Sequence, residues 1–144
     1  MTSRKSKLIV ALTIGLILGC EHKDCGCVQP PAPLEGEWTL TKITYSLTQK
    51  TVTAAEAGYA ETLSFRASSD TKGTYRRARN GIPSQTSDYS LSFPNGGSSE
   101  GSIYFLADTT QQTFRLTDNK LYLSEISPVG VTIADGSTYE YQRQ

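Results

Sequence analysis

Residues 112–126 read QTFRLTDNKLYLSEI, and this stretch is the clearest indication of the fold class. Apolar and polar residues alternate on both sides of the two-residue link Asp118-Asn119. Alternation with period two is typical of a strand with one buried face, and a link this short suits a tight hairpin turn. The stretch therefore predicts two antiparallel neighbours in a β-sheet.

The same period recurs through residues 34–144, where no run has a convincing helical period. Eight strands are predicted, at 37–45, 61–67, 72–79, 86–93, 101–106, 112–117, 120–126 and 138–143. Most links are short and rich in Gly, Asn, Asp or Pro, which favours antiparallel neighbours. The longer connection at 46–59 has room for one helical turn at 54–58. We expect an all-β domain, a small eight-stranded antiparallel up-and-down barrel, with a β-sandwich as the alternative.

The strand phase also predicts which side chains face the interior of the barrel. The expected inward set is Leu40, Leu63, Phe65, Tyr75, Tyr89, Leu91, Phe93, Ile103, Phe105, Phe114, Leu116, Leu121, Leu123, Tyr139 and Tyr141. Several inward tyrosines need hydrogen-bond partners for their hydroxyls, so a partly wet interior that admits a small amphipathic ligand is compatible with this set.

Residues 1–19 have the pattern of a secretion signal. Arg4, Lys5 and Lys7 precede an apolar run at 8–18, which is too short to span a bilayer of roughly 30 Å as a helix. The sequence ILGC that ends at Cys20 resembles the lipobox of bacterial lipoproteins. That resemblance implies cleavage before Cys20, attachment of diacylglycerol and palmitate-type chains to this residue, and a stable membrane anchor.

Residues 20–33 form the expected tether, which ends in a proline-rich segment. Its Cys25 and Cys27 lie near His22 and Asp24, but this spacing lacks a fourth ligand, so no metal site is predicted. In an oxidising compartment, a local disulfide between the two cysteines or pairing with another chain is the expected outcome. With Glu21 after the lipidated Cys20, sorting to the outer membrane is expected, and the sequence leaves open whether the domain faces the periplasm or the exterior.

Charge and composition exclude several classes of function. The chain has 14 basic and 14 acidic residues, and three of the basic ones leave with the signal, so 11 basic and 14 acidic residues remain. This balance attracts neither nucleic acid nor an anionic membrane surface. The one histidine, His22, lies in the tether, and no phosphate-binding loop, zinc motif or calcium loop is present. We therefore expect a non-enzyme without a cofactor, and Glu61, Asp88 and Glu125 are assigned to the solvated surface.

Both ends of the domain resemble a known superfamily. Gly36-Glu37-Trp38 opens the first strand and Arg143 lies in the last one, a pairing similar to that of the lipocalin and fatty-acid-binding superfamily. More closely, LEGEWTL at 34–40 together with DGSTYEY at 135–141 resembles the lipocalin-like domains of outer-membrane lipoproteins. The resemblance implies a barrel whose closed end holds the Trp38 indole under the Arg143 guanidinium, both as structural residues. A domain this short can fill its barrel with its own side chains.

One basic cluster carries a binding hypothesis. Arg76, Arg77 and Arg79 follow Tyr75 on one strand, with Arg66 on the strand before it. If Tyr75 points inward, alternation brings Arg77 and Arg79 to the open end from inside, where they suit a carboxylate or phosphate head group. The alternative is that these arginines are exposed residues that keep the protein soluble. The hypothetical ligand contacts are Tyr75, Arg77, Arg79, Tyr89, Phe105, Tyr139 and Tyr141.

Two functions remain open from the sequence. In the first, a lipid-anchored barrel binds a small apolar or amphipathic ligand at the outer membrane. In the second, a filled barrel is a structural lipoprotein that docks on another envelope protein. An open interior distinguishes the first from the second.

Overall fold

A computed structural model describes residues 32–94 and 96–144 of the chain. The predicted secretion signal at 1–19, the lipid site Cys20 and the tether up to residue 31 lie outside the described residues. The strands are β1 (Gly36–Tyr45), β2 (Lys50–Thr53), β3 (Glu61–Ser69), β4 (Lys72–Arg79), β5 (Ile82–Ser92), β6 (Glu100–Phe105), β7 (Thr110–Thr117), β8 (Lys120–Ser124), β9 (Ser127–Pro128) and β10 (Thr138–Arg143). Within residues 32–94 and 96–144, no helix is long and apolar enough to cross a membrane.

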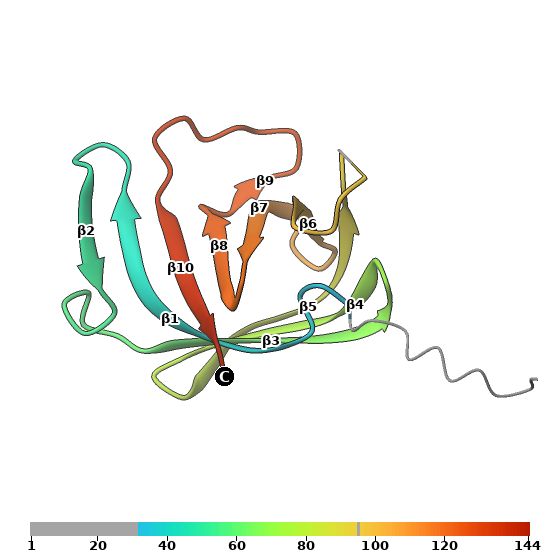
Figure 1. Cartoon of the computed structure of the whole chain (residues 1–144), viewed down its shortest axis with the longest axis horizontal. Helices are drawn as coiled ribbons and strands as arrows, with labels where there is room; N and C mark the ends of the chain where they lie inside the picture. Colours follow the sequence, from blue (N-terminus) through green and yellow to red (C-terminus); the bar gives the residue numbers. More distant parts are fainter. Residues whose placement is uncertain (1–31, 95) are drawn as a thin grey trace, which may run out of the picture.

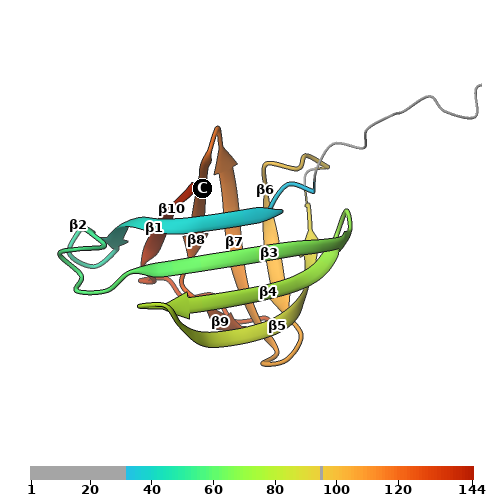
Figure 2. The same ribbon diagram turned by 90° about the horizontal axis from the view of Figure 1, so that it is seen from below.

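The sheet closes on itself into a barrel. Strands β1, β3, β4, β5, β6, β7, β8 and β10 each pair antiparallel with the next strand in this series, and β10 pairs back with β1. The closing register runs from Trp38 opposite Arg143 to Thr44 opposite Thr138. Figures 1 and 2 show the strands wrapping around one interior, with β1, β3 and β4 forming one wall. The predicted up-and-down barrel is confirmed, and the β-sandwich alternative is wrong.

Two short strands were not predicted. β2 pairs with the second half of β1 and lies within the connection expected at 46–59, and β9 pairs with β7. Four and two residues, respectively, are too short to show a period of two.

Residues 54–58, where one helical turn is expected, form a single turn that Thr53 and Glu56 cap at its N-terminal end. Thr53 and Glu56 form a reciprocal capping box, in which the Thr53 backbone N–H donates to Glu56 Oε2 at 2.7 Å and the Glu56 N–H donates to Thr53 Oγ1 at 3.2 Å. One helical hydrogen bond follows, from Ala57 N–H to the Thr53 carbonyl at 2.9 Å. Gly58, at φ +80°, then ends the turn, because this left-handed conformation cannot continue a helix.

The two ends of the barrel have different connections. We call the end that carries the connections 46–49, 54–60, 80–81, 106–109 and 125–137 the mouth, and the end that carries 70–71, 93–99 and 118–119 the closed end. At the mouth, Asn80 and Gly81 have φ values of +52° and +78°, as the two central residues of a primed hairpin turn require.

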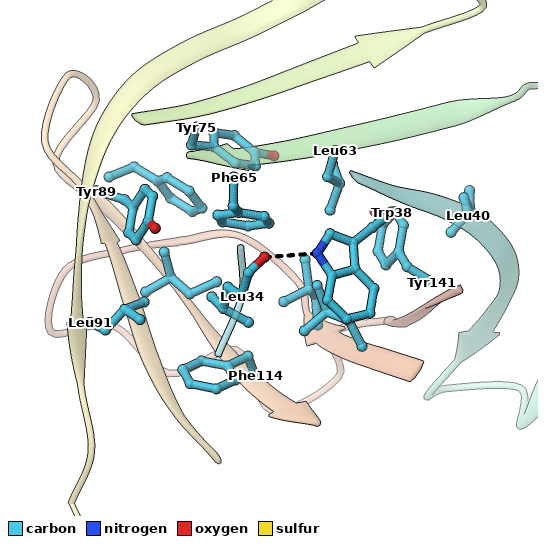
Figure 3. Close-up of a cluster of buried hydrophobic side chains, with 14 of the residues drawn as sticks. Leu34, Trp38, Leu40, Leu63, Phe65, Tyr75, Tyr89, Leu91, Phe114 and Tyr141 are labelled. Carbon is cyan, nitrogen blue, oxygen red and sulfur yellow. Dashed lines mark hydrogen bonds between the residues drawn. The ribbon is translucent and has the colours of Figure 1, made fainter. Parts of the chain in front are cut away.

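A buried hydrophobic cluster lies inside the barrel, and Figure 3 shows part of it. The Trp38 Nε1–H donates to the Leu34 carbonyl at 2.9 Å, and the Arg143 guanidinium carbon lies 4.5 Å from the Trp38 ring. Arg143 also donates to the Pro33 carbonyl at 3.2 Å. The segment before β1 is thereby held beneath the barrel by the two residues that carry the resemblance.

The side chains found inside the barrel are largely those that the alternation along the strands predicts. Every residue of the predicted inward set is buried or half-buried, with Phe93, Leu116 and Tyr139 in the half-buried group. The core additionally contains Leu34, Trp38, Ile43 and Val52. Phe65 and Tyr75 pack ring to ring with centroids 5.1 Å apart, and Tyr75 and Phe105 do so at 4.7 Å.

Candidate functional site

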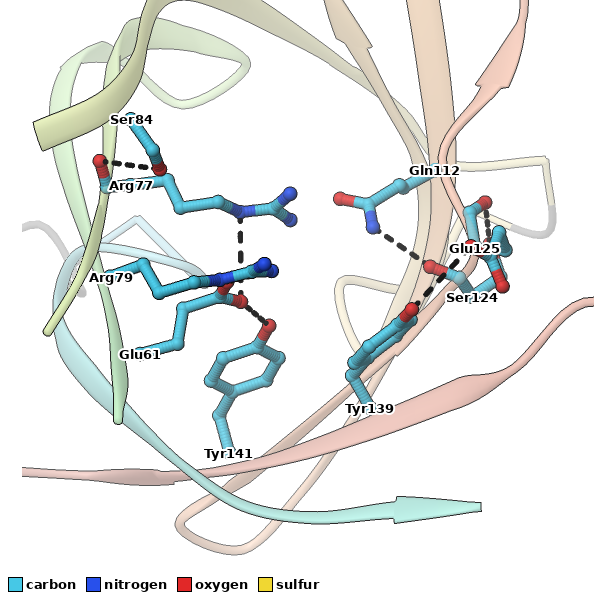
Figure 4. A network of polar contacts seen from close by, with 9 residues as sticks. All are labelled: Glu61, Arg77, Arg79, Ser84, Gln112, Ser124, Glu125, Tyr139 and Tyr141. Atoms are coloured by element: carbon cyan, nitrogen blue, oxygen red, sulfur yellow. Dashed lines mark hydrogen bonds and ion pairs between the residues drawn. The ribbon is translucent and has the colours of Figure 1, made fainter. Parts of the chain in front are cut away.

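A polar cluster lies inside the barrel at the mouth (Figure 4). Several strands contribute to it: β3 begins there with Glu61, β4 ends there with Arg77 and Arg79, and β7, β8 and β10 supply further side chains. The antiparallel register sets Glu61 directly opposite Arg79 and Leu63 opposite Arg77. Since alternate residues share a face, Arg77 and Arg79 point inward together with Tyr75.

Glu61 is the centre of this cluster and is only 2% exposed. Its Oε1 accepts a hydrogen bond from the Tyr141 hydroxyl at 2.6 Å, and its Oε2 accepts from Arg79 at 3.0 and 3.3 Å. The Arg77 Nε lies 3.6 Å from Glu61 Oε1. Arg79 and Tyr141 thus donate three hydrogen bonds to this buried carboxylate and Arg77 adds an ion pair, which satisfies the requirement that a buried charge be paired. The assignment of Glu61 to the solvated surface is wrong: it is in phase with Leu63 and Phe65 and faces inward.

Arg77 and Arg79 differ in whether their N–H donors already have hydrogen-bond partners. Arg79 is 51% exposed, is hydrogen-bonded to Glu61, and has its guanidinium carbon 4.1 Å from the Tyr59 ring. Arg77 is only 17% exposed, and its buried Nε makes no hydrogen bond with the described residues. Arg77 is thus the cation whose donors remain available inside the barrel.

The opposite wall presents acceptors. Gln112 on β7 donates from Nε2 to the Ser124 carbonyl at 2.8 Å, so its Oε1 is turned to the interior, where this buried atom has no partner among the described residues. Figure 4 shows Arg77 and Gln112 pointing toward one another across the interior. Beside Gln112, the half-buried Glu125 accepts from the Ser137 N–H at 2.9 Å and from the Tyr139 hydroxyl at 3.5 Å.

Tyrosines around this opening stay protonated. Burial raises the pKa of Tyr75 to about 12, and burial together with the nearby Glu125 raises the pKa of Tyr139 to about 12. Burial and then the charge of Glu61 raise the pKa of Tyr141 well above its ordinary value. The Tyr75 hydroxyl is buried without a hydrogen-bond partner among the described residues, and the Arg77 guanidinium lies 5.9 Å from its ring. Tyr75 therefore offers a neutral hydroxyl next to Arg77.

The predicted ligand contacts separate into two groups. Tyr75, Arg77, Arg79, Tyr139 and Tyr141 belong to the mouth cluster. Tyr89 and Phe105 instead belong to the packed core: Tyr89 meets Phe65 edge-on at 5.4 Å, and Phe105 packs on Tyr75.

The other two arginines of the basic cluster face outward. Arg66 and Arg76 line a shallow groove on the outer wall of β3 and β4, where Arg66 pairs with the exposed Glu37 at 3.6 Å. The expectation that exposed arginines keep the protein soluble thus suits these two residues and does not suit Arg77.

Sequence reasoning missed Glu61, Gln112 and Ser124 as members of the cluster. Strand phase alone places Glu61 inward, but a carboxylate among apolar residues is usually taken for a surface group. Gln112 carries a weaker signal, because it is in phase with Phe114 at the very start of the alternating stretch.

No group of three or more His, Cys, Asp or Glu side chains suited to a metal occurs in the part of the chain that the structure describes.

No protein-family model matches the chain. No curated protein matches it in sequence either. Among solved structures, the chain is similar to the fluorescent protein UnaG (14% identity, 77% of this chain and 97% of that one, TM-score 0.47). It is also similar to a Schistosoma mansoni fatty-acid-binding protein in complex with arachidonic acid (9% identity, 78% and 97%, TM-score 0.46). A third similar structure is As-p18, an extracellular fatty-acid-binding protein (10% identity, 79% and 98%, TM-score 0.47). These likenesses all have TM-scores below 0.5 and assign neither a family nor a ligand, and the barrel stands on its own strand pairings.

Proposed function

We propose that this barrel binds a small amphipathic molecule at its mouth, with the polar head group of the ligand at Arg77. The observation that carries the proposal is a group of buried polar atoms that make no hydrogen bond with the described residues: the Tyr75 hydroxyl, Gln112 Oε1 and Arg77 Nε, the last of which has only an ion pair with Glu61 at 3.6 Å. Thr110 Oγ1, at the start of β7, makes none either. A buried polar group without a partner costs about 1–3 kcal/mol, so such groups are normally satisfied by water or by a ligand. The grouping of several such atoms inside the barrel toward the mouth indicates a site.

The donors and acceptors on the two facing walls define which head group fits between them. Arg77 and Tyr75 offer donors on one side, and Gln112 offers an acceptor on the other. Glu61 is already held by Tyr141 and Arg79, so it leaves much of the Arg77 guanidinium free. A carboxylate or phosphate that accepts from Arg77, with a hydroxyl or N–H nearby that donates to Gln112, satisfies both walls.

The size of the ligand is limited by the packed core. The Tyr75 ring, next to Arg77, packs against the rings of both Phe65 and Phe105. A long chain therefore has no room to extend into the closed half, and the apolar part of the ligand lies at the mouth. This favours a short or partly inserted amphiphile over a fully enclosed fatty acid.

The proposed location rests on the sequence. A lipidated Cys20 anchors the barrel to the outer membrane, in a bacterial cell envelope, through the tether that follows it. Mass analysis of the protein purified from its host's membranes tests this: diacylglycerol and palmitate-type mass on the first peptide supports it, and a free Cys20 thiol contradicts it.

The binding proposal is tested by calorimetric titration of residues 21–144, which contain the whole barrel and its core, with octanoate. The Arg77→Gln variant is compared with Arg66→Gln, a matched control on the outer wall. Loss of one charge-assisted contact predicts roughly tenfold weaker binding for Arg77→Gln and no change for Arg66→Gln. Equal affinities in the two variants would contradict the proposal. No binding of octanoate or of octyl phosphate by the wild type would instead favour the filled barrel that docks on an envelope protein.

A further inference from the structure

The exposed hydrophobic side chains of the barrel are confined to one end. Large hydrophobic residues that are 39% to 77% exposed are found, within residues 32–94 and 96–144, at the mouth alone. We call this set the rim: Tyr45, Leu47, Ile82, Leu106, Val129, Val131 and Ile133. The described turns of the closed end are mostly polar or small, as in Asp70-Thr71 and Asp118-Asn119, and their one large apolar side chain, Phe93, is half-buried.

Hydrogen bonds between the mouth connections hold the rim in place. Ser46 donates to the Gly136 carbonyl, which joins 46–49 to 125–137. The Val129 N–H donates to the Thr109 carbonyl at 3.1 Å, which joins 125–137 to 106–109.

The rest of the mouth is tied together in the same way. The Gln85 amide donates to Asp108 at 2.7 Å and so connects β5 to 106–109. Asn80 and Ala60 exchange two bonds of 2.8 Å, which connect 80–81 to 54–60. The apolar side chains therefore stand on an ordered ring of loops.

We propose that the rim docks on the surface of a lipid bilayer, with the mouth facing the membrane. Six of its seven side chains are aliphatic and lie on several loops around an opening, and only Tyr45 is aromatic. Protein interfaces instead concentrate their binding energy in one packed centre, whereas these side chains are spread over several connections. Separate aliphatic side chains on loop tips suit shallow insertion between lipid chains.

The length of the chain before the barrel allows this orientation. Leu34 is held at the closed end, and the residues from Glu21 to Pro33 span at most about 43 Å when extended. β1 has ten residues and is about 33 Å long. A chain anchored at Cys20 therefore reaches past the side of the barrel to its closed end while the mouth touches the same membrane.

The charged side chains at the mouth indicate which kind of lipid vesicle is the suitable probe. Exposed acids, Asp108 and Asp135, and exposed bases, Lys50 and Arg79, both lie at the mouth, so no net attraction to an anionic surface is expected. Neutral phosphatidylcholine vesicles are the appropriate probe, and binding to them should be insensitive to salt.

The test places a tryptophan on the rim and another on the closed end of residues 21–144. Vesicles of phosphatidylcholine with brominated chains quench tryptophan that enters the lipid. We expect the Leu106→Trp variant to be quenched and blue-shifted, and the Thr71→Trp variant, whose exposed site is at the closed end, to be unaffected. Equal responses of the two variants, or no response of Leu106→Trp, overturn the proposal.

Two further variants distinguish docking of the rim on lipid from ligand binding in the interior and from self-association. Replacing Leu47, Leu106 and Val131 by Ser should lower vesicle binding by roughly tenfold or more. Arg77→Gln, which alters the interior, should leave quenching of the Leu106→Trp variant unchanged, so rim docking and ligand binding can fail independently. A dimer in sedimentation that disappears in the triple Ser variant would identify a second copy as the occupant and would overturn the lipid proposal.

Discussion

Replacing Glu61 by Gln should destabilise the barrel and at the same time strengthen its binding of acidic ligands. Gln keeps the shape of the side chain and can still accept from the Tyr141 hydroxyl, but it removes the negative charge between Arg77 and Arg79. Loss of the Arg79 pair contributes at most about 1 kcal/mol, because that guanidinium is 51% exposed. Arg77 is mostly buried and loses the carboxylate that lies 3.6 Å from its Nε.

Breaking a fully buried pair costs about 3–5 kcal/mol, and the partial exposure of both arginines lowers this to about 2–3 kcal/mol. The expected fall in the unfolding midpoint is roughly 10 °C for a domain of this size. Urea unfolding followed by the fluorescence of the buried Trp38 measures the change directly. Glu37→Gln is the matched control, because its ion pair with Arg66 is exposed and contributes less than about 1 kcal/mol.

The binding measurement distinguishes a structural network from a site. Once Glu61 no longer competes for Arg77, octanoate should bind the Glu61→Gln variant more tightly than the wild type, although the variant is less stable. A loss of stability no greater than that of Glu37→Gln would refute the buried network. Weaker octanoate binding by folded Glu61→Gln protein would refute the role of Arg77 as the free cation.

Three further predictions concern the closed end, the alkaline limit and ligand selectivity. Arg143→Met should lower the free energy of unfolding by about 1–2 kcal/mol, because it removes the contact with the Trp38 ring at 4.5 Å and the hydrogen bond to the Pro33 carbonyl. Urea unfolding measures this change, and an unshifted midpoint would contradict the prediction. The pKa of Tyr75 is about 12 in the folded chain against 10.0 ordinarily, so its contribution to stability is unchanged well below pH 10 and is lost as pH rises from 10 through 12, by about 2–3 kcal/mol in the free energy of unfolding. Tyr75→Phe should reduce that fall, and an identical pH profile of the variant would contradict this prediction. Gln112→Met should abolish any preference for 3-hydroxyoctanoate over octanoate, measured as the ratio of their dissociation constants, and an unchanged ratio would show that Gln112 does not contact the head group.

Much of the fold could be predicted because the barrel obeys a simple period. Strands such as β4 (Lys72–Arg79) and β10 (Thr138–Arg143) begin and end where alternation and turn residues indicate. β5 (Ile82–Ser92) begins earlier than its alternating part, because the Asn80-Gly81 turn already reverses the chain and Pro83 is tolerated at the start of the strand. Such boundaries depend on partners across the sheet, which a single strand's sequence does not contain.

The sequence predicts the inward arginines of the mouth cluster but not the carboxylate that pairs with them. Alternation from Tyr75 correctly brings Arg77 and Arg79 inward, but nothing in their own strand shows that Glu61 neutralises them. That contact depends on the register between β3 and β4, in which Glu61 lies opposite Arg79. The pairing of Tyr141 with Glu61 joins residues 80 positions apart, and only barrel closure brings them together.

Native mass spectrometry of the protein, purified from its own host's envelope, shows whether the mouth holds a ligand. If the mouth is a binding site, the wild type should carry a recurrent small molecule that octanoate displaces and that the folded Arg77→Gln variant has largely lost. A wild-type barrel that is always free of small molecules and takes up neither octanoate nor octyl phosphate would contradict the account.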